Sequence, residues 1–166
     1  MARRNRVRPE SDLQRQKPTR RPRECILVVC EGVETEPNYL SSLRTAIGLT
    51  TLEVEIVGEG AEIVGVVKEA IRLKEKRAAA AQGSNRLAEF DEVWCVVDTE
   101  RKNDNPSWER GVIQSRDTGL KLAWSNPCFE FWLLLHFKLI GRVFDGYASV
   151  RPFLRKYLKH YEKNVD

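Results

Sequence analysis

The sequence lacks several features that would place the protein in a specialised class. No apolar run approaches the roughly 20 residues that a membrane-spanning helix needs. The N-terminus is basic, but it has no apolar stretch of the kind found in signal peptides. No internal repeat is visible. We therefore expect one domain of ordinary size in the 166 residues, 42% of them hydrophobic, and a cytoplasmic protein.

Zinc-binding patterns are also missing. None of the four cysteines forms a C-x-x-C pair, and the two histidines, His136 and His160, have no spacing that matches a zinc site. Three of the cysteines lie in or beside apolar runs. We therefore predict that all of them are buried, reduced thiols: Cys25, Cys30, Cys95 and Cys128.

Positive charge is concentrated at the N-terminus. Residues 1–23 hold nine Arg or Lys and two acids, which gives +7, whereas residues 24–166 hold 19 basic and 22 acidic residues, which gives −3. A segment of this composition has too few apolar residues to fold, so we predict a disordered basic tail, 1–23, before a domain over 24–166. The tail either contacts nucleic-acid phosphates or only keeps the protein in solution.

Strand and helix patterns alternate after the tail. Short apolar or alternating runs predict strands over 25–30, 52–57, 92–97 and 120–124. Helical spacing predicts helices over 36–47, 61–81, 127–139 and 147–161. This order is typical of a three-layer α/β domain with a mostly parallel central sheet. The last helix has no stop signal, which leaves open that a C-terminal piece is missing.

Three local expectations accompany this arrangement. Thr35 is placed to cap the first helix. Residues 101–118 are polar and predict an irregular loop with at most one short helix. Pro127 stands where a proline opens a helix, and the helix that follows is apolar nearly all round, so we expect it to be heavily buried.

Acidic residues follow two of the predicted strands directly. Glu31 comes after strand 25–30, and Asp98 and Glu100 follow strand 92–97. Open α/β sheets place their ligands at the carboxyl ends of strands, and carboxylate oxygens suit Mg²⁺ or Mn²⁺ held against phosphate. Glu31 is thus a candidate general base or metal ligand, and the other two are candidate metal ligands. The alternatives are a cap or ion pair for Glu31 and ordinary loop acids for the other two.

Four further residues are accessory candidates, each with a structural alternative. Glu34 lies in the turn after Glu31 and is otherwise a helix-start acid. Asn126 is otherwise a helix N-cap, and Glu130 is otherwise an acid stabilised by the helix dipole. His136 is otherwise a hydrogen-bonded histidine of the core.

Three long motifs resemble those of the RloB-like proteins, bacterial proteins often encoded with restriction-modification or abortive-infection genes. These motifs are C-E-G-V-E-T-E-P-N-Y-L, D-E-V-W-C-V-V-D-T-E and S-N-P-C-F-E-F-W-L-L-L-H-F, and the resemblance covers roughly residues 24–160. RloB-like proteins are similar to the Toprim superfamily, whose site has one Glu after the first strand and a D-x-D after a later one. Glu31 matches that Glu, Asp98 the first Asp and Glu100 the second, with a longer arm.

The resemblance implies a function. It implies a Toprim-like, metal-dependent nuclease that cleaves DNA or RNA, tRNA included, in antiviral defence, with Mg²⁺ or Mn²⁺ as cofactor. It also implies an ATPase partner of the AAA or ABC type that senses infection. The alternative is a non-catalytic component of a restriction or defence system that binds nucleic acid or a partner protein through the basic tail.

Overall fold

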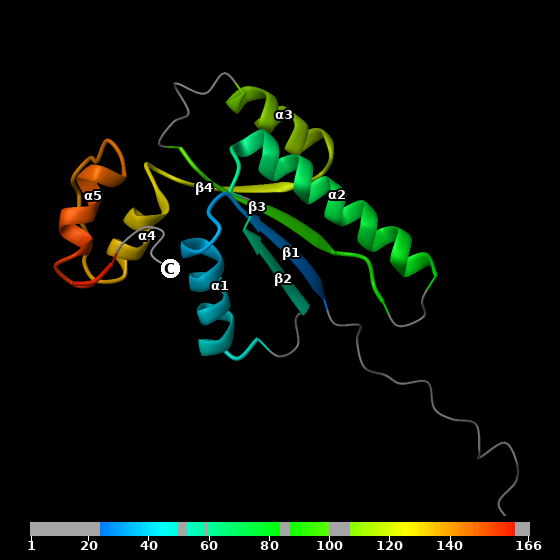
Figure 1. Cartoon of the computed structure of the whole chain (residues 1–166), viewed down its shortest axis with the longest axis horizontal. Coiled ribbons are helices and arrows are strands. Elements are labelled where there is room, and N and C mark those ends of the chain that lie inside the picture. The colour runs from blue at the N-terminus through cyan, green and yellow to red at the C-terminus, as the bar shows by residue number, and fades with distance from the viewer. Residues whose placement is uncertain (1–23, 50–52, 59, 84–86, 100–106, 162–166) are drawn as a thin grey trace, which may run out of the picture.

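A computed structural model describes residues 24–49, 53–58, 60–83, 87–99 and 107–161 (Figure 1). The predicted tail, 1–23, lies outside these residues. One sheet has the strand order β2-β1-β3-β4, and all three of its strand pairs are parallel. Its strands are β1 (Cys25–Cys30), β2 (Glu53–Gly58), β3 (Glu92–Asp98) and β4 (Lys121–Ser125).

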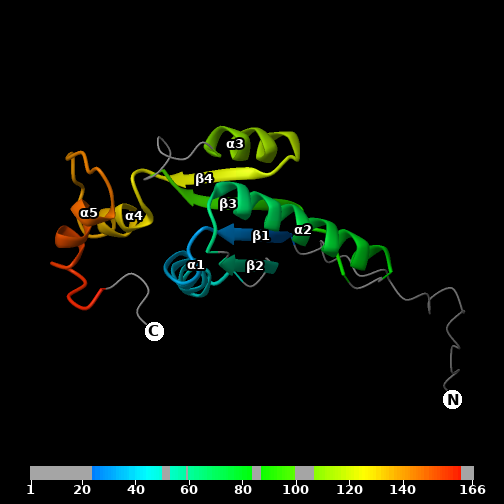
Figure 2. The ribbon, with the colours of Figure 1, turned by 45° about the horizontal axis from the view of Figure 1, so that its top comes forward.

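Helices cover both faces of this sheet. The described residues form α1 (Thr35–Ala46), α2 (Ile63–Gln82), α3 (Trp108–Asp117), α4 (Phe129–Leu135) and α5 (Tyr147–Leu154). Helix α1 lies on one face, α2 and α3 lie on the other, and α4 and α5 sit beyond the carboxyl ends of the strands (Figures 1 and 2). The predicted three-layer α/β domain with a parallel sheet is therefore confirmed.

The main hydrophobic core lies between the sheet and α2. Side chains alternate along a strand, so every second residue of β1 and β3 points towards α2. Leu27 and Val29 of β1 and Cys95 of β3 are 0% exposed. They pack with a buried stripe of α2 that consists of Ile63, Val66, Val67 and Ala70. This packing removes apolar side chains from water, which is the main favourable term in folding.

A second, smaller core lies in the C-terminal lobe, which we define as residues 128–161. Helices α4 and α5 pack on each other there. The buried side chains of this core are Cys128, Leu134, Phe144, Val150 and Leu154. The lobe therefore has its own apolar interior, and β4 leads into it at the carboxyl edge of the sheet (Figure 1).

The structure corrects the expected ends of several helices. Residues 108–117 form α3, the one short helix that the prediction for 101–118 allowed, and Trp108 and Val112 pack it against the main core. Helix α4 starts at Phe129, after Pro127, because its N-cap Cys128 has extended backbone angles. It ends at Leu135, and α5 ends at Leu154, so both helices are shorter than predicted.

Two predictions about side chains have opposite outcomes. All four cysteines are free and buried, as predicted. Thr35 is not the N-cap of α1, because that position belongs to Glu34, whose side chain makes no capping hydrogen bond. The hydroxyl of Thr35 instead lies 3.3 Å from the hydroxyl of Tyr161. Within the described ranges, no helix combines the length and apolar character that crossing a membrane requires.

Candidate active site at the carboxyl edge of the sheet

The strand order places a switch point between β1 and β3. From β1 the chain passes through α1 to β2 on one side, and from β3 it passes through α3 to β4 on the other side. Open α/β sheets bind ligands in the crevice outside the carboxyl ends of the two strands at such a point. Glu31 directly follows β1, and Asp98 is the last residue of β3. The two acids predicted from the sequence therefore lie at the position that the topology marks.

Hydrogen bonds fix Glu31 against the ends of its neighbouring strands. The backbone N–H of Asp98 donates to Oε2 of Glu31 at 3.0 Å. The N–H of Glu31 donates to the carbonyl of Val96 at 2.8 Å, and the N–H of Gly60 donates to the carbonyl of Glu31 at 2.9 Å. The carboxylate of Glu31 thus caps the end of β3, which is one of the structural alternatives stated for it above. The same hydrogen bond places this carboxylate beside the backbone of Asp98. Both acids are half-buried.

Two glycines allow the turn after β1 to pack tightly. A Cβ on Gly32 would lie 2.0 Å from Oε2 of Glu36, whose side chain is only 4% exposed. A Cβ on Gly58 would lie 2.5 Å from the Cα of Val33. Burial, helped by the nearby charge of Glu36, raises the pKa of the Cys30 thiol to about 12. The glycine after Glu31 therefore makes room for a second, buried carboxylate, that of Glu36.

Asn126 lies at the same edge and connects β4 to the segment after β3. Its Oδ1 accepts a hydrogen bond from the Thr99 hydroxyl at 3.0 Å, and the N–H of Thr99 donates to the carbonyl of Ser125 at 2.9 Å. Asn126 is therefore not the N-cap of α4. Glu100, the third expected metal ligand, lies outside the described residues.

Glu130 belongs to the interior of the C-terminal lobe. It is 0% exposed, and its Oε1 accepts a hydrogen bond from the hydroxyl of Tyr161 at 2.9 Å. Burial, with a further contribution from Glu130, raises the pKa of both Tyr161 and the Cys128 thiol above their ordinary values. Glu130 thus joins α4 to the end of the lobe, and through the hydroxyls of Tyr161 and Thr35 this contact reaches the first turn of α1.

His136 is exposed, so the prediction of a core histidine is wrong. Its Nε2 lies 3.0 Å from the hydroxyl of Tyr39, and its ring meets the ring of Trp132 with centroids 5.0 Å apart. Glu34 occupies the N-cap position of α1 in the turn after Glu31, without a capping bond from its side chain. His136 therefore contacts an aromatic cluster, while Glu34 stays close in sequence to the strand-end acids.

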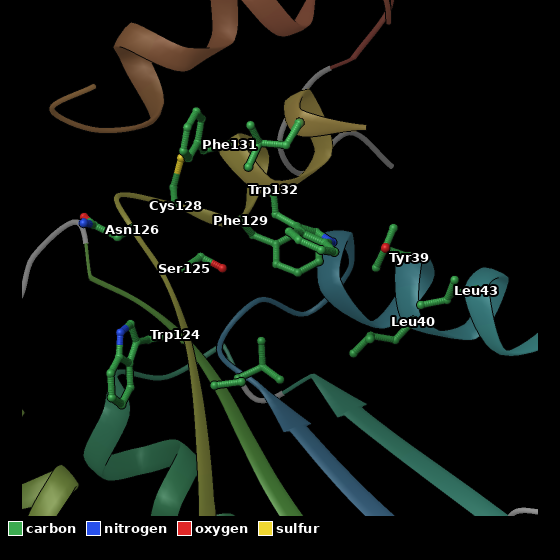
Figure 3. Close-up of a pocket in the computed structure, with 13 residues that line it drawn as sticks. Tyr39, Leu40, Leu43, Trp124, Ser125, Asn126, Cys128, Phe129, Phe131 and Trp132 are labelled. Atoms are coloured by element: carbon green, nitrogen blue, oxygen red, sulfur yellow. The ribbon is translucent and has the colours of Figure 1, made fainter. Parts of the chain in front are cut away.

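An apolar pocket of about 480 Å³ opens beside this edge, between α1 and α4 (Figure 3). Tyr39 lies on its α1 side, and Phe129 and Trp132 lie on its α4 side. The sequence pattern does not predict this pocket, because aromatic residues at helical spacing indicate a core-facing helix. The only available signal was the density of aromatic residues around Trp132.

The donor set at the edge suits a hydrated magnesium ion. Within the described residues, no group of three or more His, Cys, Asp or Glu side chains is placed to hold a metal ion. Mg²⁺ in phosphate-handling sites is often held by one or two carboxylates together with waters and phosphate oxygens. Glu31 and Asp98 supply two carboxylates of this kind at one edge of the sheet, and the backbone N–H of Asp98 contacts the carboxylate of Glu31.

Fold and site together define a parallel α/β protein with two acids at the switch point of its sheet. The sequence model of the family described as RloB-like protein matches residues 26–166, nearly the whole of the predicted domain. The chain therefore belongs to the RloB-like family, as its three motifs predicted. No curated protein and no solved structure matches it.

Proposed function

We propose that this protein is a metal-dependent nuclease with a Toprim-like site. One observation carries the proposal: the hydrogen bond from the N–H of Asp98 to Oε2 of Glu31 joins two acids at the switch point of a parallel sheet. Paired carboxylates at that position suit a divalent cation held against phosphate. The match of Glu31, Asp98 and Glu100 to the Toprim pattern, with Glu in place of the second Asp of its D-x-D, supports the same assignment.

Each acid has a role in this scheme. Asp98 holds Mg²⁺ or Mn²⁺, and Glu100, two residues further on, is the proposed third acid of the set. Glu31 either shares in holding the cation or accepts the proton of the attacking water. The cation, when bound, supplies charge that polarises the phosphodiester and stabilises the departing oxygen. The hydrogen bond from Asp98 fixes where the carboxylate of Glu31 lies before substrate arrives.

The biological role that we propose for this activity is antiviral defence. RloB-like proteins are often encoded with restriction-modification or abortive-infection genes, which supports a role in antiviral defence. We extend the proposal to an ATPase partner of the AAA or ABC type that controls when cleavage begins. Substrates to test first are tRNA and plasmid DNA.

A non-catalytic nucleic-acid-binding component is the second candidate. The C-terminal lobe favours it, because residues 128–161 hold six Lys or Arg and only two acids, and one of these acids, Glu130, is fully buried. Two of the lobe's cations lie over aromatic rings 5.0–5.5 Å away: Arg142 over Phe144 and Phe153, and Lys156 over Phe153. Basic side chains interleaved with aromatic rings are typical of surfaces that bind nucleic acid.

Cleavage assays separate the two candidates. Purified protein is incubated with tRNA and with plasmid, with Mg²⁺, with Mn²⁺ or with a chelator, and also with its ATPase partner. We expect cleavage only with a divalent cation, and a loss of about 100-fold or more in Glu31→Gln and Asp98→Asn. Asp117→Asn is the matched control, since this acid is exposed at the end of α3, away from the carboxyl edge.

Two results would contradict the nuclease. Cleavage that survives the chelator would exclude the metal mechanism. Full activity in folded Glu31→Gln and Asp98→Asn would show that the chemistry lies elsewhere. If the intact protein with its partner binds nucleic acid but never cleaves it, the binding component is the better description.

A further inference from the structure

The pocket between α1 and α4 is bounded by flat aromatic rings. Tyr39 and Phe129 meet edge to face with ring centroids 5.4 Å apart, and Trp132 stands beside them on α4 (Figure 3). Val96 of β3 and Ala123 of β4 contribute the part of the pocket that lies against the sheet. Its volume of about 480 Å³ falls within the range of roughly 300–1,000 Å³ that small ligand groups occupy in proteins.

Trp132 is a large aromatic side chain that remains partly exposed at this pocket. It projects from a helix whose neighbours Phe129 and Leu134 are buried, yet it is 47% exposed. Tryptophan offers the largest aromatic face of any side chain, and aromatic faces that line an open pocket favour planar, apolar partners with polar edges. The polar groups at the rim are few: Ser125 and Asn126 on the strand side and the hydroxyl of Tyr39 on the helix side.

The pocket is continuous with the acidic edge. Val96, which lines it, lies two residues before Asp98 on β3 and accepts the hydrogen bond from the N–H of Glu31. Asn126 lies at its rim and accepts the hydrogen bond from Thr99, the residue after Asp98. A planar group in the pocket would therefore bring any phosphate attached to it towards the two acids.

Positive charge is available on the other side of α4. Helix α4 presents one side to the pocket and the other to α5 of the C-terminal lobe (Figures 1 and 3). The cations of the lobe are Lys138, Arg142, Arg151, Arg155, Lys156 and Lys159. A strand of nucleic acid that places one base in the pocket could continue its phosphates along this lobe.

We propose that the pocket between α1 and α4 binds an unpaired nucleobase of the nucleic acid whose phosphodiester is cleaved at Glu31 and Asp98. The proposal rests on the nuclease function proposed above, and it names the substrate class: a single strand, a loop or an unpaired end. A base inside a regular duplex is paired and stacked, so it cannot enter such a pocket without being extruded.

Binding in the presence of a chelator tests this without cleavage. Fluorescence anisotropy is measured with a labelled single-stranded oligonucleotide, with the same sequence as a blunt duplex, and with an abasic strand of equal length and charge. We expect the single strand to bind tighter than both. Trp132→Ala should weaken the binding of the single strand by about 5- to 150-fold, since stacking one base contributes roughly 1–3 kcal/mol.

Phe137→Ala is the matched control. Phe137 follows the same helix and is also 47% exposed, but it stacks on Tyr157 and does not line the pocket. We expect the Phe137→Ala variant to bind the single strand as tightly as the wild type does. Ala123→Phe is a second variant that fills the pocket from the sheet side, and it should remove the preference for the single strand. Thermal unfolding confirms that each variant is folded.

Several results would overturn the proposal. Equal affinity for the abasic strand, or for the duplex, would show that no base is bound. A loss in Phe137→Ala as large as in Trp132→Ala would place the contact outside the pocket. A mononucleotide that binds as tightly as the strand would make the ligand a free nucleotide. Because no metal is present, a failed nuclease and a failed base pocket give different results: the first leaves the single-strand preference intact.

Discussion

The two faces of the sheet are built from the same strands but packed in different ways (Figure 2). On the closed face, which α2 and α3 cover, Val93, Cys95 and Val97 of β3 are 4%, 0% and 1% exposed. On the open face, which α1 covers only in part, the alternating residues Trp94 and Val96 of the same strand remain half-buried. Neighbouring residues of β3 therefore face two different environments: one packs in the core, and the next lies on the side of the pocket.

This difference separates stability from function. The closed face buries apolar side chains of the strands against two helices. The open face leaves a concave apolar surface, and Asp98 lies in register with Val96 and Trp94 on this side of β3. Substitutions on the closed face should therefore act on folding, and substitutions on the open face should act mainly on binding.

The largest expected difference in the free energy of unfolding is that between Val97→Ala and Val96→Ala. Both remove the same two methyl groups from neighbouring residues of β3, but Val97 faces the closed side and Val96 lines the pocket. We expect Val97→Ala to lower the free energy of unfolding by about 2–4 kcal/mol, and Val96→Ala by about 1 kcal/mol or less. Urea unfolding of both variants measures the difference. Equal losses would show that the open face is packed as tightly as the closed one.

Gly58→Ala tests the close packing at the carboxyl edge. Its Cβ would meet the backbone of Val33 at 2.5 Å, and backbone cannot rotate away as a flexible side chain can. We expect a loss of about 1–3 kcal/mol in the free energy of unfolding, together with reduced cleavage, because the turn that carries Glu31 must move. Gly141→Ala is the control, since a Cβ there meets nothing within 4 Å. A neutral Gly58→Ala would mean that the turn adjusts freely.

The sequence predicted the sheet better than it predicted the helices. Strand β1 was expected over 25–30 and spans Cys25–Cys30, because a short apolar run bounded by charged residues is typical of a strand in a parallel sheet. Because the strands were predicted correctly, Glu31 and Asp98, which lie at the ends of β1 and β3, were also placed correctly at the carboxyl edge of the sheet. Helix ends were less accurate, because the length of α4 depends on how its lobe packs, which no local pattern encodes.

Long-range contacts account for what the sequence could not show. The hydrogen bond between Tyr161 and Glu130 joins residues that are 31 apart, and the one between Tyr39 and His136 joins residues that are 97 apart. Periodicity reports which residues share a face of one helix, and it carries no information on which face meets another element. For the same reason, the aromatic residues of α4 were expected in the core, whereas Trp132 lines an open pocket.

Tyr161→Phe should cost about 1–2 kcal/mol of stability near neutral pH, because buried Glu130 loses the hydroxyl that donates to it. Tyr157→Phe is the control, since Tyr157 is 43% exposed and contacts Phe137 only through its ring. We expect that change to stay within about 0.5 kcal/mol. Equal, small effects in chemical unfolding would show that the contact with Glu130 contributes nothing.

The same variant carries a pH signature. Burial raises the pKa of Tyr161 above the ordinary tyrosine value of 10.0, so the folded protein holds a proton that the unfolded chain releases at lower pH. The contribution of Tyr161 is therefore complete below about pH 10 and is lost as the pH rises further. Above that pH, the free energy of unfolding should fall more steeply with pH for the wild type than for Tyr161→Phe. The difference in stability between the two proteins should therefore become smaller. Urea midpoints at a series of alkaline pH values measure this gap.

The smallest expected effect on stability is that of Trp132→Ala, and it sharpens the comparison of the two faces most directly. A tryptophan in the core would cost roughly 3–5 kcal/mol on truncation, which is what the apolar pattern of its helix predicted. Because 47% of this side chain is exposed at the mouth of the pocket, we expect a change of about 1 kcal/mol or less in the free energy of unfolding. Urea unfolding checks it, with Val97→Ala as the reference for a core change. A loss as large as that of Val97→Ala would place Trp132 among the residues that hold the fold together, and any weaker binding of nucleic acid by the variant would then follow from a damaged lobe instead of a lost stacking surface.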